Sequence, residues 1–193
     1  MTNLNVIQPH IHPSEVIRGI ATRDVEGLNV VFINMPLRET AVPNTTPEGP
    51  LLMATNLIRN YGVNASLIDL NAYRRKDELA QKRGLVNGRH LTQEEAFDKI
   101  KRHFVRFGEP DLVCLSGMIT TLKWQKAVAK MVRRLVPHTM LVSGGGLATE
   151  LKTGLFNYIP ELDAVAHSEG DDIIVKICCD AATIRRFSRR HAL

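Results

Sequence analysis

The sequence predicts an α/β domain with a doubly wound, five-stranded parallel sheet. Short continuous apolar runs alternate with longer segments of helical period, which is typical of strands covered by helices on both faces. The chain has 193 residues, of which 44% are hydrophobic and 23% charged, as in a globular domain. This length fits one domain with extensions. We expect the domain to span 28–182, between an N-terminal extension at 1–27 and a basic tail or linker at 183–193.

The first two strands are expected at 29–34 and 65–70, where short apolar runs occur. The helix between them should end at Gly62, because glycine is favoured just past a helix C-terminus. Pro50 suits the first turn of this helix, where a missing N–H costs nothing. The stripe that we expect to face the sheet consists of Leu51, Thr55 and Ile58.

A further helix should begin after Thr92, which can form a capping box with Glu95. Its shared apolar side consists of Phe97, Ile100, Phe104 and Phe107. The third strand follows at 111–116, and the next helix has the clearest amphipathic pattern of the chain and is closed by Pro137. Its apolar residues are Trp124, Ala127, Val128, Met131, Val132 and Leu135.

The remaining elements are a fourth strand at 139–143, a fifth at 163–168 and a last helix at 171–182. Right-handed crossovers between five such units give the flavodoxin-like strand order 2-1-3-4-5. Sheets of this kind bind ligands at the carboxyl ends of the strands, near the reversal between the first and third strands. The loops that we expect to frame the site are 35–49, 117–121 and 143–149.

The run MLVSGGGLATEL, residues 140–151, is the most informative stretch, because a strand leads directly into three glycines and then a helix. Glycine lets a bulky group approach main-chain N–H groups, and a helix capped by Thr149 would aim its free N–H groups the same way. The loop is therefore interpreted either as a cradle for a nucleotide-like or phosphate-bearing ligand, or as a tight strand-to-helix turn. In the first case, valine at Gly145 should block the ligand far more than it unfolds the sheet.

Several function classes are disfavoured by the residues at the strand ends. The loop after the first strand has neither a dinucleotide-binding nor a P-loop glycine pattern. Asn34 and Ser116 stand where a phosphoacceptor domain needs acids, and no nucleophile and base pair supports a stand-alone hydrolase or transferase. The cysteines show no C-x-x-C spacing and are interpreted as buried apolar residues; they are Cys114, Cys178 and Cys179.

The formal net charge of +5 is unevenly distributed. Residues 122–136 carry five basic residues and no acid, and the tail carries four arginines. Such clusters bind phosphates or nucleic acid in some proteins, but a solvated helix face is the commoner explanation, and no nucleic-acid module accompanies them. The N-terminus does not resemble a secretory signal and no apolar run has the length of a membrane span, so we expect a cytoplasmic protein.

Five segments in order carry a resemblance to a known family. They are FINMPLRE, TPEGPLLMATNLIRNYGVNASLIDLNAY, PDLVCLSGMITT, LVSGGGLATE and ELDAVAHSEGDD. Together they resemble the N-terminal cobalamin-binding domain of cobalamin-dependent radical S-adenosylmethionine enzymes. This resemblance covers residues 28 to about 182 and implies the Rossmann-like fold of that domain. It also implies that the corrin ring lies over the carboxyl ends of the strands while the nucleotide tail enters the crevice.

The resemblance implies roles for particular residues of this chain. The nucleotide tail would contact hydroxyl and main-chain groups of Ser116, Gly117, Thr120 and Thr121. It would pass close to the main chain at Gly144, Gly145 and Gly146. Apolar contacts would come from Met118 and Leu147, and further contacts from Pro36, Leu37, Arg38, Glu169 and Gly170. Local helix capping explains Ser116 and Thr121 almost equally well, and Glu169 can be an acid that complements a helix dipole.

Two departures from related patterns limit the resemblance. The Asp-x-His-x-x-Gly loop of histidine-ligating carriers is missing after the first strand, so cobalamin is expected base-off, without a histidine ligand. Arg38 could cover the lower face of the cobalt, but a guanidinium is not a ligand. Of the histidines, His10 and His12 could grip a metal, and His167 ends the fifth strand at the rim of the site.

The three-cysteine motif of radical enzymes is also missing, so no iron–sulfur cluster is expected in this chain and no catalytic residue is assigned. The preferred hypothesis is a module that presents cobalamin to a radical S-adenosylmethionine domain or another catalytic partner, for methyl transfer or related chemistry. The alternative is a non-enzymatic sensor or interaction module of the same fold that binds another nucleotide-like ligand. Nucleic acid is disfavoured as a partner, and no membrane is expected.

Overall fold

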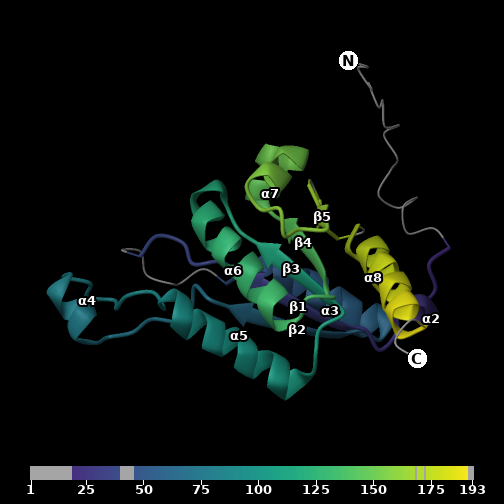
Figure 1. Ribbon diagram of the computed structural model, residues 1–193, viewed down its shortest axis with the longest axis horizontal. Coiled ribbons are helices and arrows are strands. Elements are labelled where there is room, and N and C mark those ends of the chain that lie inside the picture. The colour runs from purple at the N-terminus through teal and green to yellow at the C-terminus, as the bar shows by residue number, and fades with distance from the viewer. Residues whose placement is uncertain (1–18, 40–45, 168, 172, 191–193) are drawn as a thin grey trace, which may run out of the picture.

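The computed structural model, which describes residues 19–39, 46–167, 169–171 and 173–190, contains one parallel sheet with the order β2-β1-β3-β4-β5 (Figure 1). The predicted fold class and strand order are therefore confirmed. The first four predicted strands are displaced from the observed ones by at most one residue. The strands are β1 (Asn29–Asn34), β2 (Asn64–Asp69), β3 (Leu112–Ser116), β4 (Met140–Gly144) and β5 (Ala164–Val165).

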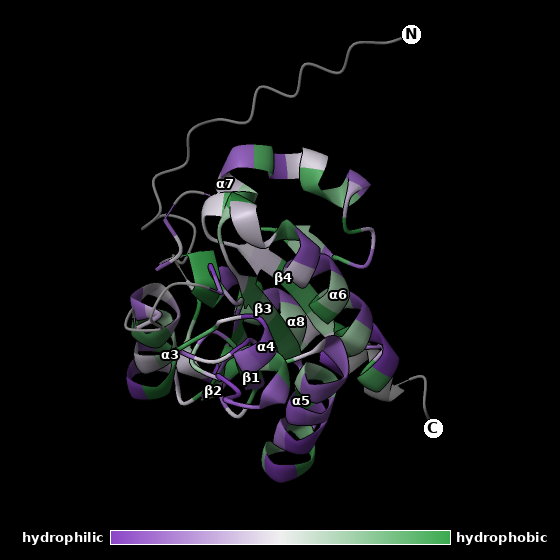
Figure 2. Cartoon of the chain, turned by 90° about the vertical axis from the view of Figure 1, so that its left-hand side faces the viewer, coloured by the Kyte–Doolittle hydropathy of each residue, from purple (hydrophilic) through white to green (hydrophobic). Residues whose placement is uncertain are grey.

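Helices cover both faces of the sheet (Figure 1). One face packs against α5 (Gln93–Phe107), α6 (Leu122–Leu135) and α7 (Gly146–Leu151). The other packs against α2 (Thr22–Val25), α3 (Glu48–Tyr61) and α8 (Ile173–Arg190). The short helix α4 (Glu78–Lys82) belongs to a segment that extends away from the sheet, and two 3₁₀ helices span Ile119–Thr121 and Lys152–Asn157. Figure 2 shows hydrophobic residues gathered on the central strands.

Alternation along the strands decides which side chains face which helices. Phe32, Cys114 and Val142 share the core cluster of α3 and α8, while their neighbours Ile33 and Leu115 share that of α5 and α6. The parallel register pairs Asn34 with Ser116, and Ser116 with Gly144, at the carboxyl ends of the strands. These positions are two residues beyond Phe32, Cys114 and Val142, so they face α3 and α8 as well.

Helix α3 confirms its predicted ends but not its predicted buried stripe. Gly62 ends it with a left-handed φ of 63°, and Pro50 lies in its first turn. The buried residues are Pro50, Ala54 and Leu57, whereas Leu51 and Ile58 are 37% and 50% exposed and Thr55 is exposed too. The two stripes are one residue apart, so the helix is rotated by about 100° from the predicted orientation.

The capping box of α5 is present as predicted. The Thr92 hydroxyl accepts a hydrogen bond from the Glu95 N–H (3.2 Å), and the Glu95 carboxylate accepts one from the Thr92 N–H (2.8 Å). On the predicted apolar side, Ile100 and Phe104 are buried and Phe97 is partly buried, but Phe107 is 53% exposed. In α6 the predicted residues all pack into the core, fully or partly buried.

The last elements differ more from the prediction. β5 has two residues in place of six, because only Ala164 and Val165 pair with β4. α8 does not end near residue 182 but continues to Arg190. Helix α2 lies within the segment predicted as an extension, and its Val25 is buried in the cluster that contains α8. Across the described part of the chain, no helix combines the length and the apolar character needed to cross a membrane.

Candidate functional site

Main-chain hydrogen bonds join the loops at the carboxyl ends of β1, β3 and β4. The Met35 N–H donates to the carbonyl oxygen of Ser116 (3.1 Å), which joins the first loop to the second. The Leu147 N–H donates to the carbonyl oxygen of Gly117 (3.1 Å), which joins the second loop to the third. The start of each loop predicted to frame the site therefore lies beside its neighbour, next to the reversal of strand order.

A cavity of about 220 Å³ opens beside these loops, on the face covered by α3 and α8. Its floor comes from the sheet and consists of Phe32, Cys114 and Val142. Its two walls are helical and consist of Pro50 and Met53 from α3, and Ile173, Ile174 and Ile177 from α8. The rest of the lining consists of Gly49, Leu115, Ser116, Gly144, Gly145, Ala166 and the segment 169–171. The cavity is thus apolar inside and rimmed by glycines.

Gly144 and Gly145 contribute to this cavity in different ways. A side chain at Gly144 would point to the α3 and α8 face, where a Cβ atom would meet only the Ala166 carbonyl oxygen at 3.8 Å. Because glycine has no side chain, the space in front of Gly144 is open to a ligand. Gly145 instead has φ 79° and ψ −165°, and its Cβ would lie 3.1 Å from the Gly117 carbonyl oxygen. The backbone itself requires glycine there, so valine at Gly145 would disturb the turn as well as any ligand.

A third glycine allows the loop before α8 to approach α3. A Cβ at Gly170 would lie 2.8 Å from the Met53 sulfur. Glu169 and Asp171 on either side of it are exposed, so their carboxylates lie at the rim in water. The start of α8 follows directly, with the Ile174 N–H donating to the Gly170 carbonyl oxygen (3.0 Å).

The polar groups inside the cavity are few and uncharged. Burial raises the pKa of the Cys114 thiol well above its usual value, and it raises that of the neighbouring Cys178 to about 12. Both thiols are therefore protonated at neutral pH. The half-buried Ser116 hydroxyl has no hydrogen-bond partner among the residues that the structure describes. Among the side chains of the described lining, Ser116 is the one that carries a hydroxyl, and this hydroxyl is available to a ligand.

The structure brings some of the predicted site residues to the cavity and places others elsewhere. Those that line it are Ser116, Gly144, Gly145, Glu169 and Gly170. Leu147 is fully buried on the opposite face, in the core of α5 and α6. Thr121 is 1% exposed and is the N-cap residue of α6, but its hydroxyl makes no capping bond to that helix and instead donates to the Met118 carbonyl oxygen (2.7 Å).

Other predicted residues lie on or beneath the loops around the cavity. Met118 is 56% exposed and Thr120 is exposed as well. Gly117 packs tightly, since its Cβ would lie 2.3 Å from the Thr121 hydroxyl. Gly146 is the first residue of α7, whose N-cap is Gly145. The predicted cap Thr149 lies inside this helix, where its hydroxyl donates to the Gly145 carbonyl oxygen (3.1 Å).

The loop after β1 is fixed by the loop after β2. The Leu37 N–H donates to the side-chain oxygen of buried Asn71 (3.0 Å), and the Asn71 N–H donates to the Asp69 carboxylate (3.0 Å). The Glu39 carboxylate accepts a hydrogen bond from the His90 N–H (3.1 Å) and pairs with Arg83. Pro36 is buried, and Arg38 is exposed between two anchored neighbours. The side chain of Arg38 is therefore exposed to solvent, while its neighbours Leu37 and Glu39 are fixed by hydrogen bonds.

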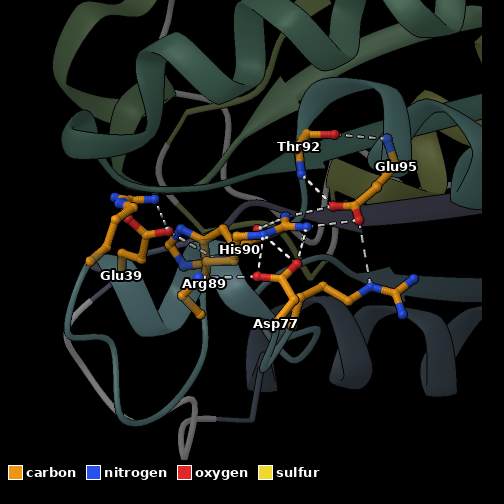
Figure 3. Close-up of polar contacts among 9 residues, drawn as sticks. Glu39, Asp77, Arg89, His90, Thr92 and Glu95 are labelled. Carbon is orange, nitrogen blue, oxygen red and sulfur yellow. Dashed lines mark hydrogen bonds and ion pairs between the residues drawn. The ribbon is translucent and has the colours of Figure 1, made fainter.

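A polar cluster that sequence reasoning missed holds the segment containing α4 (Figure 3). Buried Arg89 donates to the carboxylates of Asp77 (2.6 Å) and Glu95 (2.7 Å) and to the His90 carbonyl oxygen (2.9 Å). Burial and then the charge of Arg74 lower the pKa of His90 to about 4, so its imidazole is neutral at pH 7. The sequence feature that could have indicated this cluster was the capping residue Glu95, whose carboxylate also accepts a hydrogen bond from Arg89.

The histidines considered in the sequence as metal ligands or rim residues contribute to no metal site among the described residues. His167 is exposed beyond β5, whereas His10 and His12 lie outside the described residues. Within the described ranges, no three residues of the types His, Cys, Asp or Glu gather closely enough to hold a metal ion.

Comparison with known proteins links part of the chain to a cobalamin-dependent enzyme. A stretch of 63 residues, 33% of this chain, is 33% identical to the cobalamin-dependent radical SAM methyltransferase TokK of Streptomyces tokunonensis. The matched stretch is only 9% of that protein's length. No model of a protein family matches the chain.

Among solved structures, one shows a weak similarity over most of the chain. It is the crystal structure of RosB with a bound intermediate, 8-demethyl-8-formylriboflavin-5'-phosphate. The TM-score is 0.47 and the sequence identity 12%, over 85% of this chain and 81% of that chain.

Proposed function

We propose that the chain binds a corrinoid and presents it to a catalytic partner. Two independent observations support this proposal. The first is the 33% identity over 63 residues to an enzyme that is itself cobalamin-dependent. The second is the glycine-rimmed apolar cavity at the carboxyl ends of β1, β3 and β4, where a sheet of this order binds its ligands. The cavity is the observation that carries the proposal, because it lies in this chain.

The size of the cavity fits one part of a cobalamin molecule. Pockets for drug-sized ligands commonly have roughly 300–1,000 Å³, so the 220 Å³ of this cavity suits a single flat bicyclic ring rather than a corrin macrocycle. We propose that the base at the end of the nucleotide tail enters the cavity past Gly144 and Gly170. Ser116 would then offer its free hydroxyl to this base. The corrin ring would lie outside, over the loops that carry Arg38 and Met118.

Insertion of the tail base implies that it is not bound to cobalt. We propose that the protein binds cobalamin in this base-off form, because the loop after β1 offers no imidazole in place of the base. The exposed Arg38 would cover the lower face of the ring without coordinating the metal, since a guanidinium has no free lone pair. The half-buried Leu37 would add apolar surface to this loop beneath the ring, and the buried Pro36 would support the loop.

The proposed role is that of a carrier without catalytic residues of its own. Bound cobalamin supplies a cobalt centre that can accept and donate a methyl group. The radical chemistry would belong to a radical S-adenosylmethionine domain or another catalytic partner, because the three cysteines of this chain, Cys114, Cys178 and Cys179, do not form the three-cysteine motif of radical enzymes. The alternative function is a sensor module that binds another nucleotide-like ligand, since the cavity would admit other flat rings.

A titration of hydroxocobalamin with the folded protein, followed by its visible spectrum, tests the proposal. We expect a saturable spectral change at one corrinoid per protein. A spectrum that stays that of free hydroxocobalamin would refute corrinoid binding and favour the sensor hypothesis.

A further inference from the structure

We propose that the cavity selects among corrinoids by the base of the nucleotide tail, accepting the weakly polar dimethylbenzimidazole and disfavouring a purine such as adenine. This inference rests on the proposed corrinoid binding and deepens it. It assigns the selection to the uncharged floor and walls of the cavity, with Gly144 setting the available depth.

The argument begins with the composition of the walls. The helical walls are formed by proline, methionine and three isoleucine side chains, which provide no hydrogen-bonding groups comparable to a hydroxyl or amide. On the floor, Phe32 and Val142 are apolar, and Cys114 has a thiol, which is a weak donor and a weak acceptor. The charged members of the lining, Glu169 and Asp171, are exposed at the rim. A buried ring therefore meets apolar surface on both of its faces.

The hydrogen-bonding capacity at the mouth is also small. The Ser116 hydroxyl is free to donate one hydrogen bond, whereas the Ser116 carbonyl oxygen already accepts from the Met35 N–H (3.1 Å). The Gly117 carbonyl oxygen is likewise engaged, by the Leu147 N–H (3.1 Å). The Ser116 hydroxyl can thus satisfy a ring with one acceptor nitrogen, whereas a ring with several polar atoms needs further partners that the apolar side chains of the floor and walls do not provide.

The two bases differ in this property. Dimethylbenzimidazole that has left the cobalt has one free ring nitrogen and two methyl groups. Adenine has an exocyclic amine and additional ring nitrogens, each of which loses its bonds to water inside the cavity. Leaving one such buried group unsatisfied costs roughly a factor of 5 to 150 in affinity. We therefore expect a corrinoid with adenine to bind about tenfold more weakly or worse.

Gly144 allows the selection to be tested through the protein. Leucine at this position would extend into the cavity, because a Cβ there points toward α3 and α8 and meets only the Ala166 carbonyl oxygen, at the ordinary contact distance of 3.8 Å. Gly154 provides a matched control, since a Cβ at that residue has no atom within 4 Å and its φ is not positive. Gly144→Ala adds a single methyl group to the cavity and gives a milder version of the same change.

The experiment compares three corrinoids with the same ring: cobalamin, the analogue with adenine as the base, and cobinamide, which has no base. Dissociation constants are measured by titration calorimetry for the wild type, Gly144→Leu, Gly144→Ala and Gly154→Leu, with circular dichroism as the check of folding. For the wild type and Gly154→Leu we expect cobalamin to bind at least about tenfold more tightly than either analogue. Gly144→Leu should bind all three with similar affinity, and Gly144→Ala should reduce the preference.

The outcomes distinguish a failure of base selection from a failure of the proposed corrinoid binding. Equal affinity of the wild type for cobalamin and the adenine analogue would overturn the selection by base. Equal affinity for cobalamin and cobinamide would place the base outside the cavity and overturn the inference too, although the protein would still bind corrinoids. If none of the three binds to folded wild type, the proposed function itself fails.

Discussion

The main-chain N–H of Leu147 donates to the carbonyl oxygen of Gly117 over 3.1 Å, and this bond fixes the start of α7 against the turn after β3. Gly145 lies between them in space, with its Cβ position 3.1 Å from the same oxygen. The glycine loop is therefore part of the framework of the sheet edge as well as a boundary of the cavity.

The first prediction follows from the backbone of Gly145. Its φ of 79° and ψ of −165° lie in a region that is essentially restricted to glycine, so Gly145→Val should lower the free energy of unfolding by about 2 kcal/mol. Urea denaturation of both proteins measures the difference. Gly154→Val is the control and should unfold near the wild-type midpoint. Equal stability of Gly145→Val and the wild type would show that the turn can relax.

The second prediction concerns the pH dependence of stability. The pKa of His90 falls from 6.5 to about 4 on folding, because of burial and the charge of Arg74. Between about pH 6.5 and 4 the imidazole is therefore protonated in the unfolded chain but not in the folded one. The free energy of unfolding decreases as the pH falls through this range, by at most about 1.4 kcal/mol per pH unit. Chemical denaturation across this range measures the decrease.

His90→Gln provides the comparison, since it removes the titrating ring and keeps polar character. Protonation of carboxylates with lowered pKa values, such as those of Asp77 and Glu95, also destabilises the protein at low pH. This effect is the same in the wild type and the variant. Parallel profiles of the wild type and the variant between pH 6.5 and 4 would contradict the burial of a neutral imidazole.

The third prediction concerns the lower face of the cobalt. We expect bound cobalt(II) cobalamin to be base-off, because the loop with Arg38 offers no nitrogen ligand. Electron paramagnetic resonance should then show no nitrogen superhyperfine splitting from an axial ligand. A splitting that disappears when His167, His10 or His12 is replaced would show that a protein histidine coordinates the metal.

The sequence predicted the sheet well because the central strands β1, β3 and β4 are buried on both faces and appear in the sequence as continuous apolar runs. It was less informative for α3, where apolar residues occupy two adjacent stripes and periodicity alone favoured Leu51 and Ile58. Packing against β1 and β2 selects Ala54 and Leu57 instead. The length of α8 was underestimated because no glycine or proline marks its end, and arginines in a last turn favour a helix C-terminus.

The candidate site was predicted in part for a related reason. Residues at strand ends, such as Ser116 and Gly144, follow from the strand order alone. The helical walls do not, because Met53 and Ile174 are 121 residues apart and their approach depends on how α3 and α8 cross the sheet. The run of isoleucines at the start of α8 was the available signal. The anchoring of Leu37 by Asn71 also depends on tertiary contacts that no local pattern encodes.

Cobalt analysis after desalting tests the central claim most directly. Folded protein is incubated with excess hydroxocobalamin and passed through a desalting column, and cobalt and protein are then quantified in the same fractions. We predict a ratio near one for the wild type and for Gly154→Leu, and a clearly lower ratio for Gly144→Leu. Cobalt-free wild-type protein with an intact circular dichroism spectrum would contradict corrinoid binding, and an unchanged ratio in Gly144→Leu would remove the cavity from the site.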